Sequence, residues 1–164
     1  MKPLDFDKST IFESERLAFR GITIEDAENL IRWRSREDVY LYAFNPRPVT
    51  HCEHLAWFAK YMKNEQAYRA IITEKITNKD IGMVGGEFED GAFVISYHIG
   101  EPEHRGKGYA GEAIQSLIAF VRKASVTIVY AYVHEDNEAS ISCLRKIGFM
   151  STKKNSIMAM YKYI

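Results

Sequence analysis

Cysteine is scarce in this chain of 164 residues, which contains only Cys52 and Cys143. The two lie far apart in the sequence, and neither belongs to a CxxC pair or a Cys/His cluster. This spacing excludes a disulfide framework and argues against a structural zinc site, so no metal is expected. The reducing cytoplasm is therefore the expected location.

An excess of charge of either sign is also missing, because 22 Lys and Arg balance 22 Asp and Glu. Nucleic acids and anionic membranes attract basic surfaces, so neither is an expected partner. The longest apolar-rich runs without charge, 113–121 and 124–134, are far shorter than the ~20 residues of a membrane span. Residues 1–15 lack the apolar stretch of a signal peptide. With no repeat and no Pro/Gly/Ser-rich linker, residues 1–164 are predicted to form one domain.

The pattern of apolar residues predicts an α+β fold with a mixed sheet. Alternation with period two indicates strands, and helical periodicity after the capping residues Thr23 and Thr50 indicates helices. In chain order, the expected elements are a strand at 16–22, the two capped helices, strands at 68–73, 81–88 and 92–100, a helix at 109–123, a strand at 126–133, a helix at 137–147 and a strand at 157–164. The run 126–133 is almost entirely apolar, as in a buried strand with a parallel neighbour. The aromatic-rich segment 36–49 is expected to be irregular.

A glycine-rich loop, RGKGYAG at 105–111, directly precedes one of the expected helices. Unpaired N–H groups at a helix start and the helix dipole favour an anion there. Gly106 and Gly108 allow a phosphate to approach the backbone, and Arg105 and Lys107 add positive charge. The loop therefore predicts a phosphate site, with an ordinary turn as the competing explanation.

The same loop also matches the G-x-G-x-x-G fingerprint of dinucleotide-binding oxidoreductases, through Gly106, Gly108 and Gly111. In that fingerprint the first glycine follows its strand at once, whereas residues 100–105 intervene here. A nicotinamide-dependent oxidoreductase is therefore the less favoured hypothesis.

Three motifs resemble the GNAT acetyltransferases, in particular their RimJ/RimL-type branch. They are RGKGYA at 105–110, which fits R/Q-x-x-G-x-G/A, NEASISCLRKIGF at 137–149, which is similar to an N-x-x-S…G-F segment, and the N-terminal series Arg16-Leu17, Arg20, Asp26-Ala27, Leu30 and Trp33-Arg34. The resemblance spans about residues 16–163. It implies a GNAT fold, with a mixed, mostly antiparallel sheet of about six to seven strands and about four helices. It also implies acetyl-coenzyme A (acetyl-CoA) as co-substrate and transfer of its acetyl group to a primary amine in a ternary complex.

The resemblance assigns cofactor-binding roles to three segments. The backbone amides that would hold the pyrophosphate belong to Arg105, Gly106, Lys107, Gly108, Tyr109 and Ala110. Ile99 and Gly100 end the strand at which a GNAT sheet splays open, and their backbone would face the pantetheine arm and the oxyanion. Asn137 would contact the cofactor arm, which is compatible with its capping a helix.

Acyl transfer also needs a proton donor for the departing thiolate and a base for the amine. Many GNAT enzymes use a tyrosine seven positions after the asparagine, where this chain has Leu144. The RimJ/RimL-type branch implies Ser140 instead, and local hydrogen bonding is the competing role for this serine. Glu87 is the first candidate for the base and His98 the second. Cys143 lies mid-helix and is expected to be a buried structural thiol.

Three classes of amine acceptor stay open: a protein N-terminus, a small amine or polyamine, and a nucleotide-linked amino sugar. Trp33-Arg34 with EHLAWF at 53–58 resembles the WR…EHxxWF pattern of nucleotide-amino-sugar acetyltransferases. A polyamine would require carboxylates, which are available at Glu101, Glu103, Glu135 and Asp136.

Two further alternatives concern the chain as a whole. A GNAT-like domain that binds coenzyme A without catalysis would account for the missing tyrosine and the absence of an obvious base. The apolar final strand at 157–164 would allow a homodimer if it lies at a sheet edge.

Overall fold

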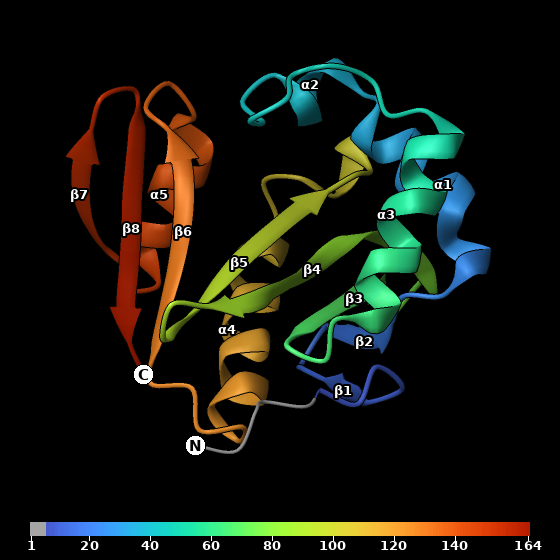
Figure 1. Cartoon of the computed structure of the whole chain (residues 1–164), viewed down its shortest axis with the longest axis horizontal. Helices are drawn as coiled ribbons and strands as arrows, with labels where there is room; N and C mark the ends of the chain where they lie inside the picture. The colour runs from blue at the N-terminus through green and yellow to red at the C-terminus, as the bar shows by residue number, and fades with distance from the viewer. Residues whose placement is uncertain (1–5) are drawn as a thin grey trace.

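A sheet of eight strands, in the order β1-β2-β3-β4-β5-β6-β8-β7, forms the centre of the computed structural model, which describes residues 6–164 (Figure 1). The strands are β1 (Ile11–Glu13), β2 (Leu17–Gly21), β3 (Ala67–Glu74), β4 (Lys79–Glu89), β5 (Ala92–Ile99), β6 (Ile128–His134), β7 (Met150–Lys154) and β8 (Ile157–Tyr163). Neighbouring strands are antiparallel except β5 and β6, which pair in parallel. The prediction of an α+β fold with a mixed, mostly antiparallel sheet is confirmed.

Helices connect the strands and cover the sheet. They are α1 (Ala27–Arg34), α2 (Glu37–Tyr40), α3 (His51–Lys63), α4 (Tyr109–Arg122) and α5 (Glu138–Lys146), with short 3₁₀ turns η1 (Ile24–Asp26) and η2 (Pro102–His104). Thr50 caps α3 as predicted, because its hydroxyl accepts from the Glu53 N–H at 3.2 Å and the Glu53 carboxylate accepts from the Thr50 N–H at 3.0 Å. The segment expected to be irregular contains the single turn α2.

The two faces of the sheet carry separate cores, because successive side chains of a strand point to opposite faces. On one face, Ile114 and Leu117 of α4 are fully buried in the cluster that contains Val84 of β4. On the other face, Trp33 of α1 packs in a second cluster with Met83 of β4. The sheet is therefore sandwiched between α4 on one side and α1 with α3 on the other (Figure 1).

Strands β5 and β6 separate soon after they begin. They pair only at Phe93↔Val129 and Val94↔Tyr130, and Figure 1 shows them diverging beyond these residues. Strand β5 continues to Ile99 without β6 beside it. One edge of β5 is therefore free of a neighbouring strand along its second half.

The prediction of a strand with a parallel neighbour at 126–133 is confirmed, since β6 pairs in parallel with β5, but β6 is buried on one face only. Strand β6 pairs with β8 along its whole length, and its exposure alternates, with Tyr132 49% exposed. The reason is that the core lies on only one face of β6, where Val129, Ala131 and Val133 are buried.

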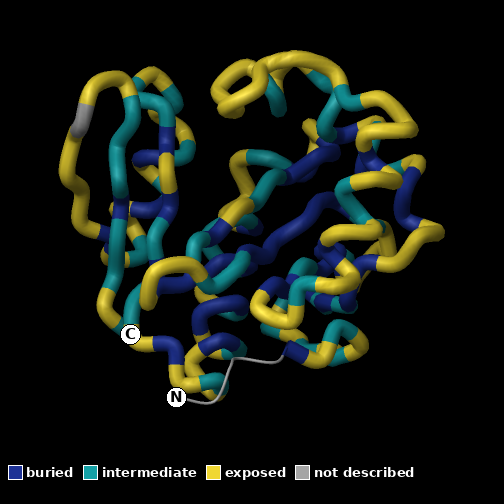
Figure 2. Tube along the Cα trace, in the orientation of Figure 1, coloured by how far each residue is buried: buried dark blue, intermediate teal, exposed yellow. Residues whose placement is uncertain are grey.

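The last strand is not at an edge of the sheet. Strand β8 lies between β6 and β7, and β7 is the edge strand, largely exposed along its described length (Figure 2). The condition under which residues 157–164 would pair across a homodimer, a position at a sheet edge, is therefore not met. Within residues 6–164, no helix combines the length and the hydropathy needed to cross a membrane.

Candidate active site

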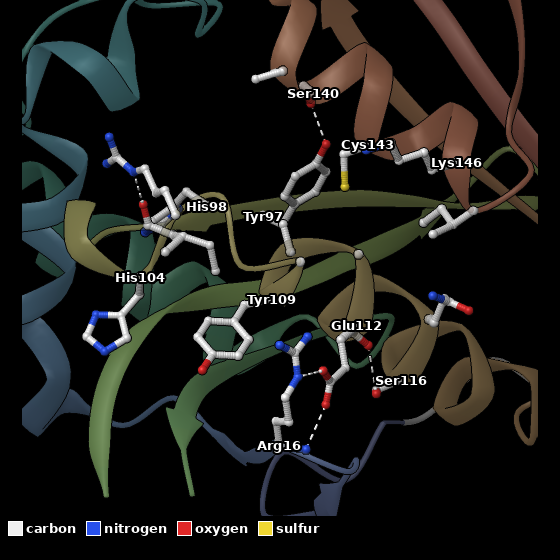
Figure 3. A pocket seen from close by; sticks show the side chains of 18 of the residues that line it. Arg16, Tyr97, His98, His104, Tyr109, Glu112, Ser116, Ser140, Cys143 and Lys146 are labelled. Atoms are coloured by element: carbon white, nitrogen blue, oxygen red, sulfur yellow. Dashed lines mark hydrogen bonds and ion pairs between the residues drawn. The ribbon is translucent and has the colours of Figure 1, made fainter. Parts of the chain in front are cut away.

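The separation of β5 from β6 opens a cleft of about 1210 Å³, which is bordered by β5, α4 and α5. Eight of the predicted site residues line it: Ile99, Arg105, Gly106, Gly108, Tyr109, Ala110, Asn137 and Ser140. Gly100, Lys107 and Glu87 do not. Figure 3 shows this cleft between the tip of α5 and the start of α4.

The glycine-rich loop delivers the open N-terminus of α4 to the cleft. Gly106 and Gly108 have φ values of +71° and +80°, in the left-handed region that side chains disfavour. Gly108 is the N-cap residue, and no side chain caps the helix there. The first N–H to donate to Gly108 is that of Glu112, at 3.1 Å. The N–H groups of the first turn therefore have no intrahelical acceptor, an arrangement that favours an anion.

The Arg105 side chain links the glycine-rich loop to β5 and to α2. Its Nε donates to the carbonyl of Ile99 at 2.9 Å, and its Nη1 donates to the Asp38 carboxylate at 2.8 Å. Hydrogen bonds from Arg36 and from Arg105 hold the pKa of Asp38 well below its usual range. The predicted contribution of Arg105 is thus confined to its backbone, because its guanidinium is engaged within the protein.

Arg16 and Glu112 form an ion pair that supports the other side of the loop, and this pairing was not identified from the sequence. The Glu112 carboxylate accepts from Arg16 Nε at 2.7 Å (Figure 3). It also accepts from the Ser14 hydroxyl at 2.6 Å. Burial opposes ionisation of Glu112, but these hydrogen bonds prevail and lower its pKa. Arg16 also donates to the carbonyl of Lys107 at 2.8 Å and lies over the Tyr109 ring at 4.5 Å. The 96 residues between Arg16 and Glu112 explain why no local pattern revealed the pair.

At the end of β5, the backbone groups of Ile99 and not those of Gly100 lie on the edge without a neighbouring strand. The Gly100 N–H donates to the carbonyl of Ile81 at 2.8 Å, so the structure does not support Gly100 as a backbone donor. Hydrogen-bonding direction alternates along an antiparallel strand, which turns the N–H and C=O of Ile99 away from β4. The Ile99 carbonyl accordingly accepts a hydrogen bond from Arg105 Nε. Gly100 has a packing role instead, because a Cβ there would lie 2.1 Å from the Trp33 ring.

Two hydroxyl groups meet across the gap between β5 and α5. Tyr97 Oη and Ser140 Oγ form a short hydrogen bond, drawn as a dashed line in Figure 3. Burial raises the pKa of Tyr97 well above its usual value. Asn137 caps α5 by accepting from the Ser140 N–H at 3.3 Å, as predicted for a capping asparagine. Tyr97 was missed because nothing in the sequence pattern pairs a strand residue with a serine 43 positions later.

The two candidate bases lie in different surroundings. Glu87 accepts from the Asn64 amide at 3.0 Å, lies 4.0 Å from the Arg69 guanidinium and does not line the cleft. The structure therefore does not support Glu87 as the base. His98 lines the cleft, but burial, with the positive charges of Arg34 and Arg105, lowers its pKa to about 3.

Two residues of α5 differ in their access to the cleft. Leu144, at the position where many GNAT enzymes have tyrosine, is fully buried and does not line the cleft. Cys143 is half-buried and does line it, and burial raises the pKa of its thiol. A raised thiol pKa disfavours the nucleophilic thiolate, which agrees with a structural role.

Most of the carboxylates considered for a polyamine are already paired within the protein. Glu101 accepts from Arg32 and from the Trp33 indole at 2.9 Å, while Glu103 pairs with Lys79 at 2.7 Å. Glu135 pairs with Lys153. Across residues 6–164, no group of three or more His, Cys, Asp or Glu is arranged to hold a metal ion.

Comparisons with known proteins identify the family. A family model described as an acetyltransferase (GNAT) domain matches residues 16–150. The uncharacterized N-acetyltransferase p20 of Bacillus licheniformis is 31% identical over 144 residues, which cover 83% of this chain and 80% of that protein.

Two solved structures share the fold. RimL, a ribosomal L7/L12 α-N-protein acetyltransferase solved with coenzyme A, has a TM-score of 0.79 and 16% identity, with 94% of this chain and 98% of that chain covered. Spermidine N-acetyltransferase from Vibrio cholerae, solved with CoA and spermine, has a TM-score of 0.80 and 18% identity, with 92% and 96% covered.

The chain therefore belongs to the GNAT acetyltransferase family, and it is an acetyl-CoA-dependent N-acetyltransferase. The hypothesis of a dinucleotide-binding oxidoreductase is wrong, because both the family match and the mostly antiparallel sheet contradict it.

Proposed function

We propose that this enzyme transfers the acetyl group directly to a primary amine within one ternary complex, at the free edge of β5. The observation that carries the proposal is the continuity of the cleft from the open N-terminus of α4 to Ile99 and Ser140. The N–H groups at 106–110 would hold the pyrophosphate of acetyl-CoA. A Cβ at Gly106 would have no atom within 4 Å, so the loop leaves room for a phosphate against the backbone.

The end of β5 is suited to stabilise the charge that develops on the thioester oxygen. The N–H of Ile99 points to the side that β6 has left, and backbone N–H groups in a water-poor site are effective oxyanion donors. The loop that carries Arg105 fixes this backbone through the hydrogen bond to the Ile99 carbonyl. Ile99 is therefore our proposed donor, in place of the pair Ile99 and Gly100.

Ser140 is our proposed proton donor to the departing thiolate, and Tyr97 is a positioning residue for it. A tyrosine whose pKa is raised by burial stays protonated, so Tyr97 serves as a neutral hydrogen-bond partner and not as the acid. When Tyr97 Oη donates to Ser140 Oγ, the proton of Ser140 is free to point into the cleft. The pair thus orients the serine hydroxyl toward the sulfur.

Substitution of Ser140 tests this assignment. Ser140→Ala is expected to lower kcat by about 100-fold or more, the range for loss of a general acid, while the Kd of acetyl-CoA stays unchanged. Ser142→Ala is the matched control, since Ser142 lies on the same helix and also lines the cleft. Tyr97→Phe is expected to lower kcat less and to leave KM for acetyl-CoA unchanged.

Kinetics with an accepted amine and calorimetric titration of acetyl-CoA provide the measurements. Equal kcat values for Ser140→Ala and Ser142→Ala would refute the role of Ser140. Binding of acetyl-CoA without turnover of any amine in a broad screen would instead favour the non-catalytic alternative.

A further inference from the structure

Four basic side chains gather on the face of the sheet opposite α4, behind the proposed transfer point. Arg34 ends α1, His54 lies on α3, Arg69 on β3 and His98 on β5. We refer to them as the cation cluster. The Trp57 ring lies 5.5 Å from the His54 ring and 5.4 Å from the Arg69 guanidinium, and the ring of Trp33, the residue before Arg34, lies 6.0 Å from the His98 ring.

The charge of the cation cluster is poorly compensated by the protein. Arg34 is half-buried and makes no hydrogen bond or ion pair with any residue in 6–164. Arg69, whose side chain is only 12% exposed, forms an ion pair with Glu87 at 4.0 Å and lies over the rings of Trp57 and Tyr61, so Arg34 is the member without such a partner. Burial lowers the pKa of both arginines. Burying a cation without a close partner is costly, so such an arrangement calls for an external anion.

Hydrogen-bonding capacity is also left unused in the cation cluster. Nε2 of His54 and Nε2 of His98 are buried and have no partner within the described chain. Burial and the charge of Arg34 lower the pKa of both imidazoles, which therefore stay neutral near pH 7. A neutral imidazole protonated at Nε2 can donate one hydrogen bond to an oxyanion.

Glu87 pairs with Arg69 at 4.0 Å, and two further carboxylates near the cluster are committed elsewhere. Glu101, which is 8% exposed, accepts hydrogen bonds from Arg32 and Trp33. Asp38 is held by Arg36 and Arg105. A polycationic amine would therefore meet paired carboxylates and the unpaired guanidinium of Arg34, which is unfavourable.

The cation cluster also adjoins the proposed reaction point. His98 lines the cleft and directly precedes Ile99 in β5. Its ring packs edge-on against Trp33, at 6.0 Å between centroids, on the face opposite that of Ile99. His98 is therefore the member of the cation cluster that also borders the cleft.

We propose that the cation cluster is the acceptor subsite for an oxyanion, so that the substrate is a small amine that also carries a phosphate or carboxylate. Arg34 is the principal ligand, and the two imidazoles supply further hydrogen bonds. This inference rests on the proposed direct transfer at Ile99, since it places the rest of the acceptor relative to that point.

Matched amines test the subsite through kcat/KM. O-phosphoethanolamine, β-alanine and ethanolamine present the same two-carbon amine with a phosphate, a carboxylate or a hydroxyl group, and putrescine presents a second cation. We expect at least about a tenfold preference for one of the anionic amines over ethanolamine, the scale of one charged hydrogen bond. Which anion is preferred distinguishes phosphate from carboxylate.

Arg34→Gln is expected to abolish that preference and to leave the Kd of acetyl-CoA unchanged. Arg122→Gln is the control, because it removes the same charge from an exposed position at the end of α4. Equal kcat/KM for ethanolamine and both anionic amines, a preference for putrescine, or a preference that survives Arg34→Gln would each overturn the subsite while leaving acetyl transfer intact.

A binding measurement decides the matter if none of these amines is turned over. Enzyme saturated with coenzyme A, which occupies the pyrophosphate site, is titrated separately with inorganic phosphate and with acetate, and the imidazole resonances of His54 and His98 are followed by NMR. We expect one anion to shift both resonances with an affinity at least tenfold weaker in Arg34→Gln. No shift with either anion, or an equal affinity in the variant, would refute the subsite. Failure of coenzyme A to bind would instead refute the proposed function.

Discussion

Two glycines with the same backbone requirement but different positions allow a sharp test of the phosphate loop. Gly106 has φ of +71° and Gly91, in the turn between β4 and β5, has φ of +86°. A Cβ added at either position would meet no atom within 4 Å. Substitution by alanine should therefore lower the free energy of unfolding by about 1–2 kcal/mol at either position, because alanine disfavours the left-handed conformation. For a protein of this size, that loss lowers Tm by about 2–8 °C in both variants.

The two variants should differ once acetyl-CoA is added, because Gly106 lines the cleft and Gly91 does not. At a ligand concentration 100 times Kd, the wild type gains about 2.7 kcal/mol. We expect the Cβ of Gly106→Ala to hold the pyrophosphate away from the N–H groups and to weaken binding at least tenfold. That change would reduce the gain to about 1.4 kcal/mol or less. Gly91→Ala should keep the full gain.

Thermal unfolding with and without acetyl-CoA, together with calorimetric titration, measures both effects. The reasoning would be refuted if Gly106→Ala and Gly91→Ala bound acetyl-CoA with equal affinity. It would also be refuted if the two variants differed in stability by several kcal/mol without ligand, because a Cβ would then contact neighbouring atoms at one of the two positions.

The remaining predictions concern buried positions. Leu144→Tyr should lower the free energy of unfolding by about 1–3 kcal/mol through overpacking, without raising kcat, and a higher kcat would show that this position does reach the cleft. The pKa of Glu101 is lowered to about 2, chiefly by its hydrogen bond with Arg32. The ionised carboxylate therefore contributes its whole stabilisation above pH 4.5, and this contribution is lost as the pH falls through about 2. Denaturant titrations should therefore show Glu101→Gln less stable than wild type at pH 7 and equal to it near pH 2. Since the pKa of His98 is lowered to about 3, its imidazole should show no titration by NMR between pH 5 and 8. The free energy of unfolding should decrease as the pH falls below 6.5, because there the unfolded chain binds a proton at this histidine and the folded chain does not.

Short-range patterns predicted the local structure well, because the interactions involved are themselves local. The Thr50–Glu53 capping box lies within one turn, and the turn before Ala92 uses adjacent residues. The positions of the short edge strands were harder to predict from the sequence. Strands β1 and β7 have only three and five residues, and each depends on a neighbouring strand that the local sequence does not identify.

The glycine-rich loop shows how far such a pattern extends toward function. It correctly predicted that a helix begins after Gly108, and the structure leaves open space beside Gly106, where a phosphate is predicted. It did not show that Arg105 would turn to Asp38, or that Arg16 would support the loop from the N-terminal part of the chain. Those partners are 67 and 91 residues away from the loop residues that they contact.

By itself, the sequence determined the family, the order of most elements and the helix that follows the glycine-rich loop, because glycine, capping residues and hydrophobic periodicity act over a few residues. Only the tertiary structure decided the rest. It separated β5 from β6, committed Gly100 to Ile81, and brought Tyr97 to Ser140. These outcomes depend on which strands compete for a shared edge and on the burial of distant side chains. They follow from the packing of the whole chain and not from any one segment of it.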